Sequence, residues 1–225
     1  MASLPFDSQP GERFVYGYST DILGAVVEVV SGASLDAFLR ERLLEPLGME
    51  DTHFYLPESK RGRLATVYSS DAGGLKEAPD PGSMVGQGTY VEGPRKSFSG
   101  GAGLLSTAHD YGRFLQMTLN GSVLDERRLL SPASVRLTTV NHGGERFGWT
   151  LGSGFGLGFS VVEDLGLRGS PGSEGEYGWG GAYHSSYWVD PSEELVVVYL
   201  TQVIPASGRD DHAKLRALVY AAIVD

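Results

Sequence analysis

The sequence predicts an α+β fold in which helices come first and an antiparallel sheet, closed by a C-terminal helix, comes last. Apolar residues recur at helical spacing between residues 19 and 50. Two strand-like runs flank a short turn between residues 182 and 202, and a helical pattern returns from about Arg209. Together these observations place a helical part before a sheet part.

The first fifty residues predict a helical hairpin. Ser19 or Thr20 caps the first helix, which ends at Ser31-Gly32, and Ser34 caps the second helix, which ends near Gly48. The apolar stripe of the first helix consists of Ile22, Leu23, Val26, Val27, Val29 and Val30. A stripe of this kind is typical of a helix that packs one face on a core.

Residues 57–101 predict long loops, because they are rich in Pro, Gly, Ser and charge and show no sustained period. Loops of that length inside a compact domain are usually functional or mobile. A helix follows Thr107, which forms an approximate capping box with Asp110, and it stops at Asn120-Gly121. A further short helix starts at Ser131-Pro132.

The last third predicts strands. Residues 156–163 alternate roughly, while residues 182–190 and 194–202 flank a four-residue turn and therefore predict an antiparallel hairpin. Residues 195–200 are continuously apolar, which is typical of a strand covered on both faces. A terminal helix from about Arg209 completes the pattern.

No repeat and no clear linker divides the chain, so we expect one domain over residues 1–225. Residues 1–155 would form its mainly helical and loop part, and residues 156–225 its strands and last helix. The formal net charge of −10 argues against nucleic acid, and the absence of Cys excludes disulfides and thiolate metal sites. The sequence shows no apolar run long enough for a membrane span and no signal-peptide pattern at its start, which favours a cytoplasmic protein.

Metal and phosphate sites are not indicated. The five histidines are His53, His109, His142, His184 and His212. No pair has the i, i+4 spacing of a helical zinc site, so we expect scattered surface or loop histidines and no metal. The turn at Gly100-Gly101-Ala102-Gly103 precedes a helix but lacks a phosphate-loop pattern, so we expect close packing there and no cofactor.

Two aromatic-glycine clusters remain, at residues 14–19 and 177–182. Either each cluster is packing in which Gly makes room for large rings, or a tyrosine serves as a general base beside a strand edge whose N–H groups bind an oxyanion. The chain contains no G-x-S-x-G elbow, and none of its four lysines follows a Ser by three positions, so no S-x-x-K motif exists.

Five segments, in order along nearly the whole chain, resemble the serine β-lactamase and penicillin-binding-protein-like superfamily. The similarity is closest to the class C-like branch and its family VIII esterases. The segments are residues 9–24, 31–52, 99–107, 178–181 and 188–191. The resemblance implies a β-lactamase/transpeptidase-like fold, an antiparallel sheet with a helical subdomain.

The resemblance also implies roles for individual residues. Tyr16 would be the catalytic tyrosine, and Tyr18 stands where many members carry Asn. Trp179-Gly180-Gly181 stands where β-lactamases carry Lys-Thr-Gly, in the form seen in esterase-like members, and the N–H of Ala182 would be an oxyanion donor. The expected substrate-binding residues are Tyr18, Trp179, Gly180, Gly181 and Ala182.

The sequence departs from the family in one large respect. The family's preceding half carries the first strands and the Ser-x-x-Lys helix, and we expect this chain to lack both. Serine is a weak nucleophile without a neighbouring base, and a tyrosine needs a nearby cation to lower its pKa. We therefore expect an open sheet edge and a helix left uncovered behind the sheet.

Three hypotheses follow for function. In the first, another chain supplies Ser and Lys across the open edge and completes a hydrolase that acts on a small acyl or ester substrate. In the second, the chain is a non-catalytic binding or interaction protein, which could cover its edge as a homo-oligomer. In the third, Ser99 or Ser185 serves as a nucleophile. The chemistry we expect is acyl transfer to a serine followed by hydrolysis, foremost of carboxylic esters.

Overall fold

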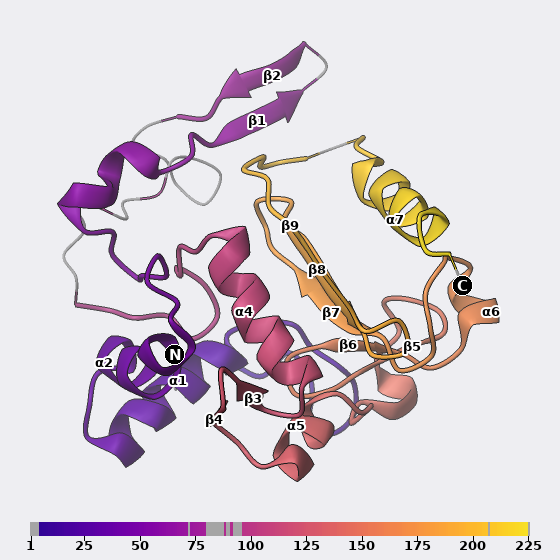
Figure 1. The fold of residues 1–225 in the computed structure, drawn as a ribbon, viewed down its shortest axis with the longest axis horizontal. Helices are drawn as coiled ribbons and strands as arrows, with labels where there is room; N and C mark the ends of the chain where they lie inside the picture. The colour runs from indigo at the N-terminus through magenta and orange to yellow at the C-terminus, as the bar shows by residue number, and fades with distance from the viewer. Residues whose placement is uncertain are drawn as a thin grey trace.

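The computed structural model describes residues 5–71, 73–79, 88, 91, 96–206 and 208–224. A five-stranded antiparallel sheet in the order β5-β6-β7-β8-β9 organises them. Its strands are β5 (Ser153–Phe155), β6 (Ser160–Val162), β7 (Tyr177–Gly180), β8 (Ser186–Asp190) and β9 (Leu195–Tyr199). Helix α4 (Ala108–Leu119) lies on one face of this sheet and helix α7 (Asp211–Ala221) on the other, while the N-terminal helices lie beyond α4 (Figure 1).

The N-terminal helices form where predicted but do not make a hairpin. Helix α1 (Ser19–Ser31) is followed by α2 (Leu35–Leu39), a π-helical turn η1 (Arg40–Leu44) and α3 (Glu45–Leu47). The two helical stretches, residues 19–31 and 35–47, meet at a bend of 80°. A hairpin would need them antiparallel, so this expectation was wrong. Among the described residues no single helix is long and apolar enough to cross a membrane, and only this bent pair passes that test when taken together.

The caps of these helices differ from one another. Ser34 caps α2 as predicted, because its side chain accepts a hydrogen bond from the N–H of Ala37 at 3.3 Å. Neither Ser19 nor Thr20 caps α1, whose N-cap is Tyr18 without a side-chain hydrogen bond. The helix therefore begins one residue earlier than a Ser19 cap would allow.

The apolar stripe of α1 is exposed, contrary to the expectation that it packs on a core. Val29 and Val30 are 83% and 82% exposed, and Ile22, Leu23 and Val26 are also exposed. Gly24 is the buried residue of this helix, packed against Leu35 and the backbone of Gly100. The described part of the chain covers the glycine side of α1 and leaves its larger apolar side in solvent.

Residues 57–101 hold more regular structure than predicted. A 3₁₀ helix η2 (Glu58–Arg63) is followed by an antiparallel hairpin of β1 (Tyr68–Asp71) and β2 (Gly74–Glu77). The strands carry polar, largely exposed side chains, so the alternation that predicts a strand is missing from their sequence. Residues 72, 80–87, 89–90 and 92–95 of this stretch lie outside the described part.

The middle of the chain follows the sequence prediction closely. Thr107 caps α4 by accepting from the N–H of Asp110 at 3.1 Å, and the helix ends at Asn120. Ser131 likewise caps α5 (Pro132–Thr138). Short elements that the sequence did not indicate are β3 (Val123–Leu124), β4 (Arg127–Arg128), η3 (Gly144–Arg146) and α6 (Leu165–Arg168).

The sheet confirms the predicted hairpin and narrows its bounds. Strands β8 and β9 pair antiparallel, with Asp190 opposite Leu195. Residues 156–163 contribute only the three residues of β6, because Gly156 and Gly158 belong to the turn after β5. Strand β9 is half-buried and pairs only with β8 among the described strands, so the expected open edge is present.

The core beneath the sheet joins α4 to β6, β7 and β8. Its fully buried members are Leu115 from α4 and Val189 from β8, both 0% exposed. The other buried members of this cluster are Phe159, Val161 and Tyr177. Because Tyr177 and Val189 are register partners, this packing fixes the pair of strands that leads to the candidate site.

Candidate functional site

The structure brings the two aromatic-glycine clusters together. The indole Nε1–H of Trp179 donates to the phenolic oxygen of Tyr16 at 3.5 Å, although 163 residues separate the two side chains. Their ring centroids lie 5.8 Å apart. Tyr16 is 59% exposed, so a second molecule can reach its side chain.

An aromatic wall supports this pair. Phe14 packs against Phe147 and Phe155, with ring centroids 5.1 Å and 4.9 Å away. Trp149 contacts both Tyr16, at 5.3 Å, and Trp179, at 5.9 Å. These contacts hold the extended segment before α1 against the strand that carries Trp179.

Trp149 is a member of the site that sequence reasoning missed. It lies in the connection between η3 and β5, and its side chain is 54% exposed. The run Phe147-Gly148-Trp149 is a third aromatic-glycine cluster, and this signal was available in the sequence.

Two glycines of the β7–β8 hairpin, Gly178 and Gly180, are required by close backbone contacts. A Cβ on Gly178 would lie 2.3 Å from the carbonyl oxygen of Tyr187, and one on Gly180 would lie 2.8 Å from that of Ser185. A Cβ on Gly181 would lie 2.6 Å from the side-chain oxygen of Ser185. The close approach of the two strands therefore accounts for Gly178 and Gly180, whereas the hydroxyl next to Gly181 belongs to a side chain that can rotate away.

The backbone N–H of Ala182, in the same turn, has no acceptor among the described residues. The N–H of Gly181 donates to the carbonyl of Ser185 at 2.9 Å, and the N–H of His184 donates to that of Gly181 at 3.0 Å. Ala182 is exposed, and its N–H meets no acceptor in the described part of the chain. Tyr18, in contrast, is 66% exposed at the start of α1, and no recorded ring contact joins it to Tyr16 or Trp179.

Among the described residues, neither alternative serine is hydrogen-bonded to a lysine or a histidine. The hydroxyl of Ser99 donates to the carboxylate of Asp21 and accepts from the N–H groups of Gly101 and Ala102, so it joins the glycine turn to α1. Ser185 lies in the β7–β8 turn, and among the described residues its hydroxyl has no recorded hydrogen bond to a basic side chain. The Ser99 hydroxyl thus has a structural role in this turn, and neither serine has the neighbouring amine or imidazole that usually activates a nucleophile.

The glycine turn itself is a packing device, as predicted. A Cβ on Gly100 would lie 2.1 Å from the carbonyl oxygen of Thr20. A Cβ on Gly101 would lie 2.8 Å from both Thr20 and Asp21. Residues 99–101 therefore fasten the first turn of α1, immediately after Tyr16 and Tyr18.

Three of the four lysines are engaged away from Tyr16. Lys60 pairs with Asp51 at 2.8 Å, Lys76 with Asp71 at 3.0 Å and Lys214 with Asp210 at 2.9 Å. Asp51 also accepts two hydrogen bonds of 2.7 Å from Arg63. The Arg63 guanidinium, together with Lys60, holds the pKa of the Asp51 carboxyl well below its usual range.

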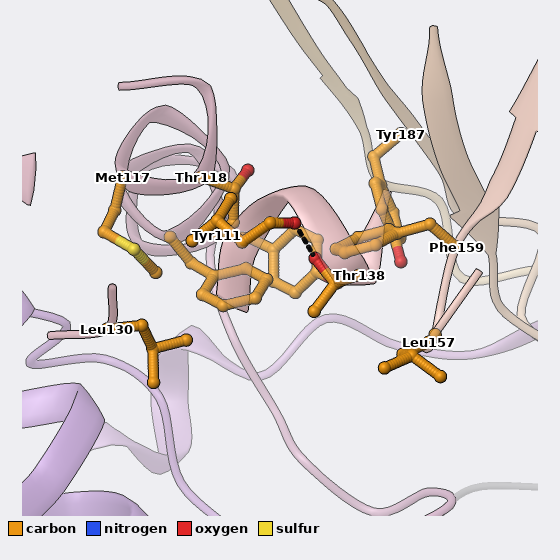
Figure 2. A pocket seen from close by; sticks show the side chains of 11 residues that line it. Tyr111, Met117, Thr118, Leu130, Thr138, Leu157, Phe159 and Tyr187 are labelled. Atoms are coloured by element: carbon orange, nitrogen blue, oxygen red, sulfur yellow. Dashed lines mark hydrogen bonds between the residues drawn. The ribbon is translucent and has the colours of Figure 1, made fainter. Parts of the chain in front are cut away.

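An apolar cavity of about 270 Å³ lies under the sheet, between α4 and α5. Figure 2 shows Met117 and Leu130 on one side of it, Phe159 and Tyr187 on the other, and Tyr111 between them. Burial raises the pKa of the Tyr111 and Tyr187 phenols, so both stay protonated near neutral pH. Neither Tyr16 nor Trp179 lines this cavity, and we do not place the site there.

The opposite face of the sheet carries a buried ionic cluster. Glu176 is 2% exposed and pairs with Arg216 from α7 and with Arg168 from α6. The hydroxyl oxygen of Tyr220 lies 2.7 Å from a carboxylate oxygen of Glu176 and 2.8 Å from one of Asp190, and its single hydrogen is donated to one of them at a time. Burial raises the pKa of Glu176, and its two arginines and Tyr220 oppose that rise. The cluster attaches α7 to the sheet.

Two of the histidines are not scattered, which corrects the sequence expectation. The imidazole rings of His184 and His212 stack with centroids 3.9 Å apart, and His184 bonds Asp211 at 2.9 Å. His184 and His212 are 28 residues apart and meet only through the fold. Helical spacing could not reveal this contact, because His184 lies in the β7–β8 turn and His212 in α7.

The Beta-lactamase family matches residues 1–221. The chain belongs to this family. Esterase EstB of Burkholderia gladioli is 34% identical over 89% of the chain, and lovastatin esterase of Penicillium rubens is 31% identical over 92%. A solved structure titled EstCE1, a hydrolase with promiscuous acyltransferase activity, superposes with a TM-score of 0.82 at 30% identity and covers 95% of the chain.

These similarities confirm the β-lactamase/transpeptidase fold that the resemblance implied. They also cover only part of each relative. The chain spans 52% of the length of EstB, 55% of lovastatin esterase and 57% of EstCE1. The chain thus corresponds to about half of each of these proteins.

Proposed function

We propose that this chain carries the tyrosine and the glycine-strand wall of a serine hydrolase that cleaves carboxylic esters. The hydrogen bond between Trp179 and Tyr16 is the observation that carries the proposal, because it joins the two expected motifs in one exposed wall. The esterases among the relatives support the same reaction class.

The nucleophile must then come from outside this sequence. No lysine follows a serine by three positions in the 225 residues, and three of the four lysines are paired with aspartates. The exposed stripe of α1 and the open edge of β9 supply two surfaces on which a complementing polypeptide could pack. We propose that such a segment brings the Ser-Lys pair to Tyr16.

Each expected residue has a defined task in this reaction. The serine oxygen attacks the ester carbonyl, its proton passes to the Tyr16–Lys pair, and the N–H of Ala182 donates to the oxyanion. The proton returns to the departing alcohol as the acyl-enzyme forms. Water, deprotonated by the same pair, then releases the carboxylic acid. Trp179 and its glycines shape the wall, and Tyr18, exposed at the start of α1, is the residue that we propose meets the substrate as it enters.

The test uses a short-chain p-nitrophenyl ester and a fluorophosphonate probe. The chain alone should show neither turnover nor covalent labelling. Mixed with the segment of EstB that this chain does not match, it should turn over the ester while the added segment takes the label. Turnover with labelling of the lone chain would refute the two-part enzyme.

Tyr16→Phe tests the role of the phenol in the restored enzyme. We expect kcat/KM to fall at least about 100-fold, the usual scale for loss of a general base. Tyr68→Phe, which removes a hydroxyl from β1 in the separate hairpin, is the matched control and should keep full activity. Equal activity of the two variants would show that Tyr16 only packs.

A second candidate function is a non-catalytic binding protein. The exposed apolar stripe of α1 favours it, because a second copy of the chain could cover that stripe as well as a complementing segment could. This candidate predicts that the chain sediments as a homo-oligomer. It also predicts that the chain does not hydrolyse the ester, with or without the added segment.

A further inference from the structure

We propose that His184, Asp211 and His212 form a binding site for a divalent transition metal of the zinc class. His184 lies in the β7–β8 turn, and Asp211 and His212 are the first two residues of α7. One potential ligand atom from each of the three lies within 4.8 Å of the others, and all three residues are partly buried. The site is independent of the proposed esterase function.

The distances match a shared ion. Two ligands bound to one tetrahedral zinc at bond lengths of 2.0–2.1 Å lie about 3.3 Å apart. The Nε2 atom of His184 and the Oδ1 atom of Asp211 are 2.9 Å apart, so a small outward movement of either side chain admits the ion. An ion here would replace the hydrogen bond between them.

Outer contacts already orient the proposed ligands. The Nε2 atom of His212 lies 3.1 Å from the carbonyl oxygen of His184, to which its N–H donates, and this tautomer leaves Nδ1 free to bind a metal. The hydroxyl of Tyr199 donates to the second carboxylate oxygen of Asp211 at 3.0 Å and leaves Oδ1 for the ion. Support of this kind is typical of metal-binding histidines and carboxylates.

The chemistry of the donors selects the metal class. Two imidazoles and one carboxylate suit zinc, nickel or copper, whereas calcium and magnesium require oxygen ligands. Three protein ligands leave one position of a tetrahedral ion open to water. The rings of His184 and His212 are now parallel to within 10°, so one ring must rotate about its broad terminal torsion to point its lone pair at the ion.

Binding would connect two separate elements. His184 holds a left-handed backbone conformation, with φ of 63°, in the turn that also contains Ala182. A metal joining this turn to α7 would restrain the backbone around the N–H of Ala182. This consequence for the oxyanion donor rests on the proposed function, whereas the metal site does not.

Titration calorimetry of the full chain with zinc chloride tests the site. We expect saturable binding at one zinc per chain. His184→Asn retains a residue that tolerates positive φ, and His212→Ala removes the second ligand. Each should weaken zinc binding by at least about 10-fold, the scale seen when metal sites lose supporting groups. His109→Ala, which removes an exposed imidazole from α4, should bind as the parent chain does.

Two further measurements use the parent chain and so do not depend on the folding of a variant. Cobalt in the parent chain should give the intense visible bands of a four- or five-coordinate ion. Zinc should shift the NMR signals of the imidazole rings of two of the five histidines, His184 and His212. Absence of saturable binding, unchanged affinity in both variants, or zinc shifts confined to other histidines would each overturn the proposal.

Discussion

Replacing Gly178 or Gly112 with alanine should move stability in opposite directions. A Cβ on Gly178 would lie 2.3 Å from the carbonyl oxygen of Tyr187 and 2.9 Å from the Cα of Trp188. Both atoms belong to the backbone of β8, so no side-chain rotation relieves the contact and the two strands must separate. Overpacking of this kind costs 1–3 kcal/mol in general, and we expect about 3 kcal/mol for Gly178→Ala.

Gly112 provides the matched control. It lies inside α4, and a Cβ there would meet no heavy atom within 4 Å. Alanine is favoured over glycine in a helix by about 0.8–1 kcal/mol, so Gly112→Ala should stabilise the chain by about that amount. The two variants should therefore differ by about 4 kcal/mol in the free energy of unfolding.

Urea unfolding followed by tryptophan fluorescence measures this difference. Trp179 directly follows Gly178, so Gly178→Ala should also change the fluorescence of the folded state by disturbing its contact with Tyr16. If Gly178→Ala unfolds at the same urea concentration as the parent, the close pairing of β7 and β8 is wrong. The reasoning that these glycines are required by the hairpin would then fail.

Two further predictions concern the body of the fold. Leu115→Ala should cost about 3 kcal/mol because Leu115 is fully buried, whereas Leu137→Ala, at a side chain 54% exposed, should stay within about 0.5 kcal/mol in the same urea assay. The depressed pKa of Asp51 means that its carboxyl binds a proton less tightly in the folded chain than in the unfolded chain. The ionised carboxylate therefore stabilises the folded chain above the ordinary pKa of 3.8. This stabilisation is lost progressively as the pH falls below that value. Thermal unfolding from pH 7 to pH 3 should thus show the gap between the parent and Asp51→Asn begin to narrow once the pH falls below about 4. A constant gap over this range would contradict the role of Lys60 and Arg63.

Local signals in the sequence were sufficient for much of the fold. Ser34 and Thr107 each cap a helix as predicted, and a helix starts at Ser131-Pro132 as predicted, because such signals depend only on residues about three positions away. The β8–β9 hairpin also follows from neighbouring residues. In contrast, the polar strands β1 and β2 pair through their backbones, which leaves no apolar alternation to detect.

Features that depend on distant contacts were harder to predict. The stripe of α1 has the period of a buried face, yet burial requires a covering surface that the described residues do not provide. The family resemblance predicts that Tyr16 and Trp179 belong to one site. The residues alone left open whether their clusters only pack or also carry chemistry. The contact of Trp149 with Tyr16 and the stacking of His184 on His212 join residues far apart in the sequence, so local patterns could not predict them.

The contact between Tyr16 and Trp179 closes a long stretch of chain. Closing a loop of 163 residues costs about 4.5 kcal/mol in chain entropy, before any constant for stiffness. A few ring contacts and the bond from Arg146 to the carbonyl of Gly11 hold the leading segment in place. Because so few contacts hold it, we expect this segment to open locally at a lower free energy than the sheet needs to unfold.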